Sequence, residues 1–78
     1  MNSAIITKTE QNGSTYFETV SRGVAYCAFF EKSVGEWFVS SHRLALGRNH
    51  IGGGKYFKQI ADCKPFAALP VLLDLGAI

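Results

Sequence analysis

Apolar and polar residues alternate along the first half of the chain, and short turn motifs divide that half into segments. Alternate residues of a strand point to opposite faces, so this alternation in β-branched and aromatic segments indicates strands. Asn12-Gly13 indicates a hairpin, because a type I′ turn needs positive φ at both central residues. The pattern predicts an antiparallel meander of four strands, over residues 4–10, 14–20, 24–32 and 36–41.

The second half of the chain is richer in glycine and does not continue this alternation. Residues 42–54 contain four glycines, which favour a long loop because glycine adopts turn conformations without steric cost. An extension of the fourth strand through residues 44–46 is the alternative for the start of this segment. Residues 55–57 include two aromatic residues, so we expect a brief fifth strand there, at a sheet edge.

Residues 60–75 are the one segment in which apolar residues recur at helical spacing. Pro70 must kink or divide this helix, because proline removes a backbone donor and clashes with the preceding turn. We therefore predict an α+β fold, with residues 1–78 as a single domain: an antiparallel four- to five-stranded meander with a C-terminal helix packed on one face. Four residues form the apolar face of that helix: Phe66, Leu69, Leu72 and Leu73.

The third predicted strand, residues 24–32, is apolar on both of its faces. A strand of this kind needs a covering layer on each side. A chain of 78 residues has few other segments to supply two layers. What covers the second face is therefore the question that bears most directly on function.

Counting residues through the turns assigns the large side chains to faces. A three-residue turn at 21–23, with Val20 opposite Val24, gathers four large rings on one face. The opposite face has two small residues at its middle, Ala25 and Cys27, where a helix can lie close, so we expect the helix on that side. The face without the helix then carries Tyr16, Tyr26, Phe30 and Trp37.

Four rings without a helix above them exceed the exposed apolar patch of roughly 300–600 Å² that is usual for a soluble monomer. Tyrosine and tryptophan are also enriched at binding hot spots. We therefore expect these four rings to anchor a protein partner, with charge at the edge of the contact from Arg43, Arg48 and Lys55. Two alternatives stay open: the faces are reversed, or residues 42–54 fold over the rings, and either would make the rings core.

Charge is unevenly distributed along the chain. Residues 42–64 hold five basic residues and one acidic residue, a net charge of +4, whereas residues 1–41 have a net charge of −1. A basic, glycine-rich loop at 42–58 that includes Tyr56 and Phe57 would suit the phosphates and bases of a nucleic acid. Because the whole chain is only +2, nucleic-acid binding is the alternative function and protein binding the preferred one.

No constellation of residues indicates catalysis, a cofactor or a metal. Two glycines have the separation found in a phosphate-binding loop, but Gly53 stands where that motif needs lysine. A cysteine nucleophile lacks an identified base. We expect a non-enzymatic protein with no cofactor and no metal. The four potential zinc ligands lack the close pairing typical of zinc sites: Cys27, His42, His50 and Cys63.

The sequence also bears on where the protein acts. No apolar segment reaches the ~20 residues of a membrane-spanning helix, and the N-terminus lacks the basic start and apolar segment of a secretory leader. Two cysteines far apart do not form a disulfide framework. We therefore expect a cytoplasmic protein without membrane contact, in which free sheet edges also allow two copies to pair as a homodimer.

Two segments resemble short proteins encoded by plasmids and phages. They are L-A-L-G-R-N-H-I-G-G-G-K-Y-F-K-Q-I-A-D, from Leu44 to Asp62, and F-A-A-L, from Phe66 to Leu69. In size and in its sheet-plus-helix plan, the chain is also similar to anti-CRISPR proteins, phage products that block host defence complexes by binding them. The resemblance implies an inhibitor that occludes a host nucleic-acid-handling complex rather than a catalyst. It assigns no site residue.

Overall fold

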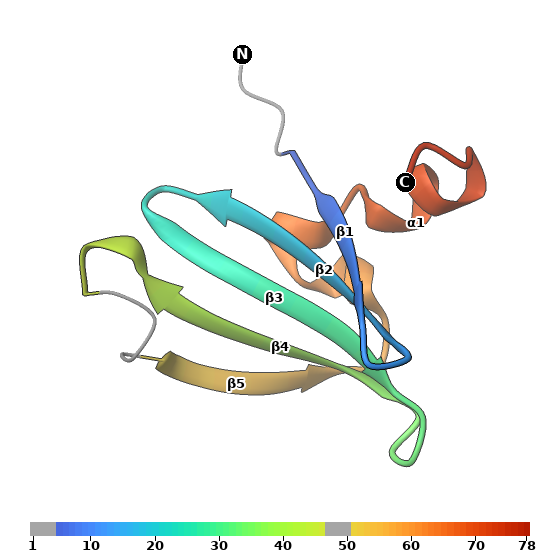
Figure 1. The fold of residues 1–78 in the computed structure, drawn as a ribbon, viewed down its shortest axis with the longest axis horizontal. Coiled ribbons are helices and arrows are strands. Elements are labelled where there is room, and N and C mark those ends of the chain that lie inside the picture. Colours follow the sequence, from blue (N-terminus) through green and yellow to red (C-terminus); the bar gives the residue numbers. More distant parts are fainter. Residues whose placement is uncertain (1–4, 47–50) are drawn as a thin grey trace.

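The computed structural model describes residues 5–46 and 51–78. In this part of the chain, five strands form one antiparallel sheet in the order β1-β2-β3-β4-β5, followed by a C-terminal helical segment (Figure 1). The predicted α+β class is therefore confirmed. The strands are β1 (Thr7–Gln11), β2 (Ser14–Ser21), β3 (Val24–Glu31), β4 (Glu36–Arg43) and β5 (Ile51–Phe57).

The first hairpin forms as predicted. Asn12 and Gly13 have φ values of 54° and 78°, the positive values that a type I′ turn requires. Thr9 therefore lies opposite Tyr16, in the register expected from a two-residue turn.

The second hairpin differs from the prediction by one residue. Arg22 and Gly23 both have positive φ, 53° and 77°, so they form a two-residue turn, with Ser21 opposite Val24. The predicted three-residue turn, with Val20 opposite Val24, is wrong. Because side chains alternate between faces with a period of two, this single residue moves β3 and everything after it to the opposite face relative to β2.

The hydrophobic core lies between one face of the sheet and the C-terminal segment. The sheet contributes Phe17, Ala28 and Val39, which lie in register across β2, β3 and β4. Thr19 is buried beside them and donates a hydrogen bond of 2.9 Å from Oγ1 to the carbonyl of Ile5, which satisfies its hydroxyl group. From outside the strands β2–β4 the core gains Ile6, Ile60, Cys63, Phe66 and Leu69.

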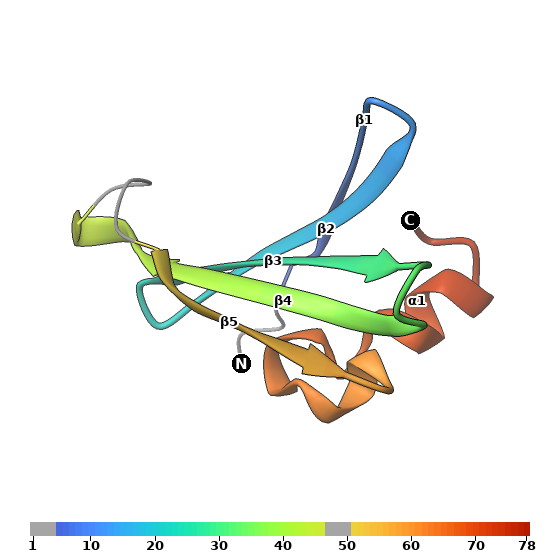
Figure 2. The ribbon, with the colours of Figure 1, turned by 90° about the horizontal axis from the view of Figure 1, so that it is seen from below.

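The C-terminal segment is not the single kinked helix predicted over residues 60–75. It forms two 3-10 turns, η2 (Ile60–Asp62) and η3 (Lys64–Phe66), and then a short helix α1 (Leu69–Asp74). Proline stands at the start of both η3 and α1, where its missing N–H has no intrahelical partner to lose. Figure 2 shows these turns following one face of the sheet. No helix within residues 5–46 and 51–78 packs against the other face, which we call the uncovered face.

The predicted loop over residues 42–54 is also shorter than expected. His42 and Arg43 belong to β4, and η1 (Leu44–Leu46) follows it as a 3-10 turn, so the fourth strand does not extend through 44–46. β5 begins at Ile51 and therefore includes glycines that local propensity assigns to a loop. Pairing with β4, which places Ser40 opposite Gly54, outweighs that propensity.

Candidate functional site

Four aromatic rings cross the uncovered face of the sheet in a row, one from each of four adjacent strands. Their centroids are 5.6 Å apart from Tyr16 to Phe29, 5.8 Å from Phe29 to Phe38 and 5.0 Å from Phe38 to Tyr56. The interplanar angles are 61°, 56° and 60°. The two outer contacts are edge-to-face, an arrangement that aromatic pairs favour, and the Phe29–Phe38 contact is tilted. We call these four residues the aromatic ladder.

Phe38 occupies the space that a side chain at residue 54 would fill. A Cβ added to Gly54 would stand 2.7 Å from Cε1 and 3.0 Å from Cε2 of the Phe38 ring, and closer still to Cζ. The ring therefore lies over the bare backbone of β5. This contact allows Phe38 to reach Tyr56, the last and most exposed ring of the ladder at 43%.

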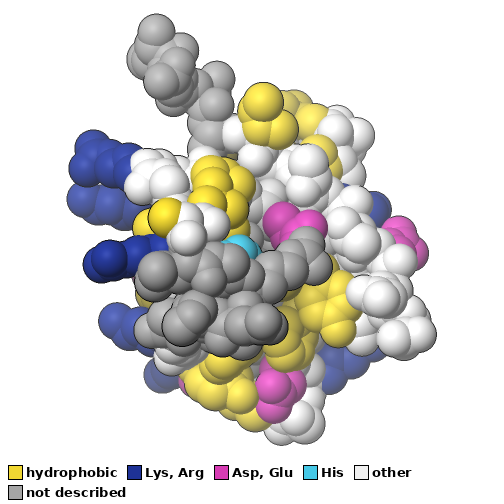
Figure 3. All heavy atoms as spheres, turned by 60° about the vertical axis from the view of Figure 1, so that its left-hand side comes forward, with side chains coloured by type: hydrophobic (Ala, Val, Ile, Leu, Met, Phe, Trp, Pro, Cys, Tyr) yellow, Lys and Arg dark blue, Asp and Glu magenta, His cyan; other side chains and the backbone are white. Residues whose placement is uncertain are grey.

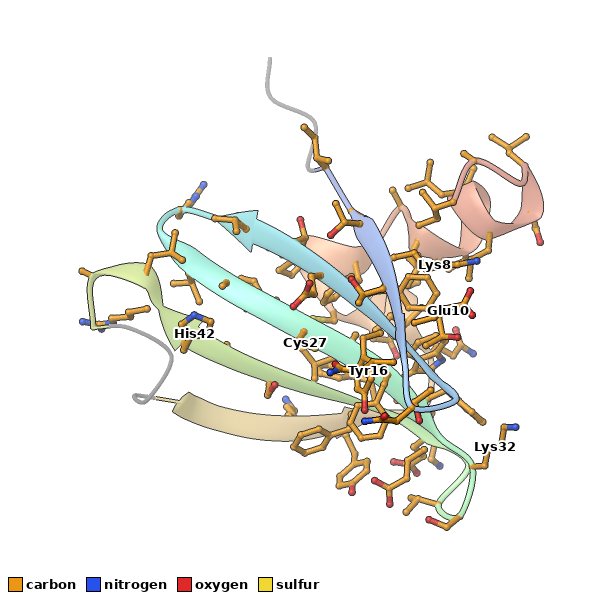
Figure 4. The ribbon with its side chains drawn as sticks, viewed as in Figure 1. Lys8, Glu10, Tyr16, Cys27, Lys32 and His42 are labelled. Atoms are coloured by element: carbon orange, nitrogen blue, oxygen red, sulfur yellow. The ribbon has the colours of Figure 1, made fainter. Side chains whose placement is uncertain are left out.

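A row of smaller residues runs beside the ladder on the same face. Cys27 lies opposite Ser40, and Ser40 lies opposite Gly54. Ala25 and His42 form the next opposed pair. Figure 4 shows Tyr16, Cys27 and His42 distributed along this face of the sheet. The rings therefore stand above a lower surface, so the face is stepped rather than flat.

Acidic side chains accompany the ladder. Glu31 and Glu36 lie directly opposite each other next to the Phe29–Phe38 pair. Tyr56 Oη donates a hydrogen bond of 3.1 Å to Glu31 Oε1. That hydrogen bond is the main reason that the pKa of Tyr56 is raised, with further contributions from slight desolvation and from the charges of Glu31 and Glu36. Phenol, carboxylates and rings thus form one continuous surface at this end of the sheet.

The structure describes six of the seven residues expected to bind a partner, and it does not bring them together. Tyr16 lies in the aromatic ladder. Tyr26 and Trp37 pack against the core, and Phe30, 44% exposed, contacts Trp37 at 5.6 Å on the covered side. The expected grouping of these four rings on an uncovered face is wrong, because the one-residue shift at the second hairpin turns β3 and β4 over.

Arg43 and Lys55, two of the three expected basic residues, do not border the ladder. Arg43 is exposed at the end of β4, opposite Val24. Lys55 is exposed on β5, with Nζ 5.4 Å from the centroid of Phe57, and its register opposite Val39 puts it on the covered side. Arg48 lies outside the described residues.

Sequence reasoning missed three of the four ladder rings: Phe29, Phe38 and Tyr56. Phe29 and Phe38 directly neighbour Phe30 and Trp37 in sequence and therefore point to the opposite face of the sheet. Once the register between β2 and β3 is known, strand alternation places Phe29 and Phe38 on the same face as Tyr16. Positive φ at Arg22 is the feature that sets this register. Arginine is not among the residues that usually occupy this position, so the sequence carries little signal for it.

A second feature, a cavity of about 300 Å³, lies on the covered side between the sheet and the C-terminal turns. Burial raises the pKa of the Cys63 thiol at this cavity, and this outweighs the opposing effects of a hydrogen bond from the Phe66 backbone and of the Lys55 charge. A thiol held in its protonated form is a poor nucleophile. Eight residues line the cavity: Tyr26, Val39, Ser41, Gly53, Gly54, Lys55, Phe57 and Cys63.

Within the described residues, no three histidine, cysteine or acidic side chains lie close enough together to bind a metal ion. None of the helices described there has the length and apolar character that crossing a membrane requires. The face with the ladder and the carboxylates is the one on which no helix of residues 5–46 and 51–78 packs. No protein-family model, curated protein or solved structure matches this chain.

Proposed function

We propose that this protein is a non-enzymatic protein-binding module and that it contacts its partner through the uncovered face of the sheet. The aromatic ladder is the observation that supports this proposal. Four adjacent rings on a face without a covering element form an apolar patch of the kind that marks interaction sites on soluble proteins. Aromatic anchors of this type account for much of the binding energy in protein interfaces.

The size of the face suits a specific interface. The molecule measures 35 × 33 × 23 Å, and the sheet forms its broad side (Figure 1). A stable interface of standard size buries roughly 800 Å² on each partner, and the broad side offers enough area for it. The rings already restrict one another through their edge-to-face and tilted contacts, so little side-chain entropy is lost when a partner covers them.

The mode of action that we propose is occlusion. The ladder and its neighbours offer hydrophobic contact and hydrogen bonding but no nucleophile with an activating base, so the protein acts by occupying a surface of its partner. The resemblance to anti-CRISPR proteins supports a host defence complex as that partner. A second copy of this chain could occupy the same face, so that the protein forms a homodimer; this is the alternative partner within the same proposal.

An affinity experiment with two matched variants tests this proposal. Tyr16→Ala removes the ring at the end of the ladder, whereas Phe30→Ala removes a partly exposed ring on the covered side of the adjacent strand. Wild-type and variant proteins are immobilised and exposed to a host-cell lysate, and melting is measured for each. We expect Tyr16→Ala to lose a captured partner that Phe30→Ala retains, while both variants stay folded. Equal capture by the folded Tyr16→Ala protein would refute the proposal.

Binding of nucleic acid through the basic segment 42–58 is the second candidate. Arg43 and Lys55 support it, because both are exposed and both lie on the side of the sheet away from the ladder. This candidate predicts a mobility shift of DNA or RNA that weakens steeply with salt, since each neutralised phosphate releases counterions. Absence of a shift at micromolar protein and low salt would exclude it.

A further inference from the structure

The charged residues on the uncovered face are all acidic. Among the strand residues whose side chains the structure describes, Glu18, Glu31 and Glu36 share this face with the ladder, and no lysine or arginine does. The basic side chains of the strands, Lys8 and Lys55 among them, are on the covered side. Figure 3, an oblique view, shows most of the Lys and Arg side chains along one margin of the molecule. A chain of net charge +2 therefore carries a negative face.

The pair formed by Glu31 and Glu36 is unfavourable for the isolated protein. Like charges directly opposite each other on neighbouring strands destabilise a sheet, and the repulsion acts close to half-buried rings. The ion pair within residues 5–46 and 51–78 joins Lys8 to Glu10 at 3.8 Å, on the covered side. Neither Glu31 nor Glu36 has an ion-pair partner among the described residues; Glu31 instead accepts hydrogen bonds from Tyr56 and Ser33.

Guanidinium groups match this combination of side chains best. An arginine forms paired hydrogen bonds with a carboxylate and stacks on an aromatic ring with the same planar group. Tyr56 joins the two elements of the face, because its ring contacts Phe38 and its hydroxyl group donates to Glu31. A lysine would provide charge without the planar stacking.

We propose that the partner of the uncovered face is an arginine-rich protein surface, of the kind that otherwise binds nucleic-acid phosphates. This inference rests on the proposed function and names the chemistry of the partner at the same face. Charge complementarity steers association of such surfaces, and stacked rings then hold the arginines in place. The protein thus occupies the basic surface of its partner with carboxylates in the place of phosphates.

A fluorescence anisotropy experiment with labelled peptides tests this inference. The probes are nona-arginine, nona-lysine and nona-glutamate, titrated with the full chain at low and at physiological salt. The test variant is the double substitution Glu31→Gln, Glu36→Gln. Its control is Asp62→Asn, Asp74→Asn, which changes the net charge equally but lies in the C-terminal segment. We expect nona-arginine to bind more tightly than nona-lysine, and nona-glutamate not to bind.

The double glutamine variant should weaken nona-arginine binding about tenfold or more, and the asparagine control by less than about twofold. The substitution removes the repulsion between residues 31 and 36 but also weakens the charge-assisted hydrogen bonds that Tyr56 and Ser33 donate to Glu31. Urea denaturation of each variant therefore accompanies the binding measurement, to establish that the variant stays folded. Equal weakening by the two variants would overturn the inference, since net charge alone would then explain binding. Failure of nona-arginine to bind at low salt would overturn it too.

Two further measurements separate this inference from the proposed function. If the lysate partner depends on Tyr16 but its capture is unchanged by the double glutamine variant, the protein-binding function stands and the arginine-rich partner is refuted. If sedimentation shows a wild-type dimer that the glutamine variant abolishes, the occupant of the face is a second copy of this chain. That result would also refute an arginine-rich partner protein.

Discussion

Replacing Gly54 with alanine tests how closely the aromatic ladder is packed. No unusual φ requires glycine at this position, so the new methyl group is excluded by space alone. It would meet the Phe38 ring at 2.7 Å from Cε1 and 3.0 Å from Cε2, and the ring must move away from β5. That movement breaks the contacts of Phe38 with Phe29, at 5.8 Å, and with Tyr56, at 5.0 Å.

The magnitude follows from two opposing terms. Each aromatic contact contributes about 0.5–1.5 kcal/mol beyond the area it buries, so loss of two contacts costs about 1–3 kcal/mol. Alanine restricts the unfolded chain more than glycine does and returns about 0.4–1 kcal/mol. We therefore expect Gly54→Ala to lower the free energy of unfolding by about 1 kcal/mol, within a range of about 0–2.6 kcal/mol.

Urea denaturation in two backgrounds isolates the role of the ring. The free energy of unfolding is measured for wild type, Gly54→Ala, Phe38→Ala and the double variant. With the Phe38 ring absent, Gly54→Ala should be neutral or slightly stabilising. If alanine at residue 54 costs the same in both backgrounds, the proposed packing of Phe38 over Gly54 is refuted.

Four further predictions concern the core, a turn and two titrating groups. Trp37→Ala should approach the roughly 3–5 kcal/mol loss in unfolding free energy that is typical of aromatic core truncation, seen as a lower melting temperature; unchanged melting would place the indole outside the core. Asn12→Pro should destabilise the first hairpin, because proline cannot adopt the observed φ of 54°, and urea denaturation measures the loss. The folded chain holds the Tyr56 proton more tightly than the unfolded chain, since its pKa is raised above 10.0; the associated stability is complete below pH 10 and lost as the pH rises through the folded value. Glu31→Gln should lower that pKa in an ultraviolet titration. Burial raises the pKa of Cys63 above 9.0, so its alkylation at pH 8 should be slow until urea is added, and rapid native labelling would contradict this.

The predicted grouping of Tyr16, Tyr26, Phe30 and Trp37 on one face is wrong for a local reason. The alternation within β3 and β4 correctly pairs Phe30 with Trp37 and Phe29 with Phe38. The sequence therefore identifies which rings share a face of the sheet. Whether a pair is covered or uncovered depends on the turn that joins β2 to β3. A type I′ turn that begins with Arg22 rather than with asparagine or glycine is not evident from turn preferences. One residue at this turn exchanges the two pairs between faces.

The C-terminal half was harder to predict because its structure depends on distant residues. Local preference favours a loop at the glycines of residues 52–54, yet they belong to β5, in which Gly53 and Gly54 pair with β4. The helical spacing of residues 60–75 correctly indicates that Phe66 and Leu69 are buried. The two prolines divide that segment into short turns, and the turns are held by packing on the sheet rather than by their own length.

The sequence by itself determines the elements of this protein. Hydrophobic alternation and the Asn12-Gly13 turn specify an antiparallel meander, because strand periodicity and turn conformation are local properties. Only the tertiary structure decides which aromatic rings the C-terminal segment covers and which it leaves as the ladder. That choice depends on register across β2 and β3 and on Phe38 lying over Gly54. Both are relations between strands, and no single stretch of sequence encodes them.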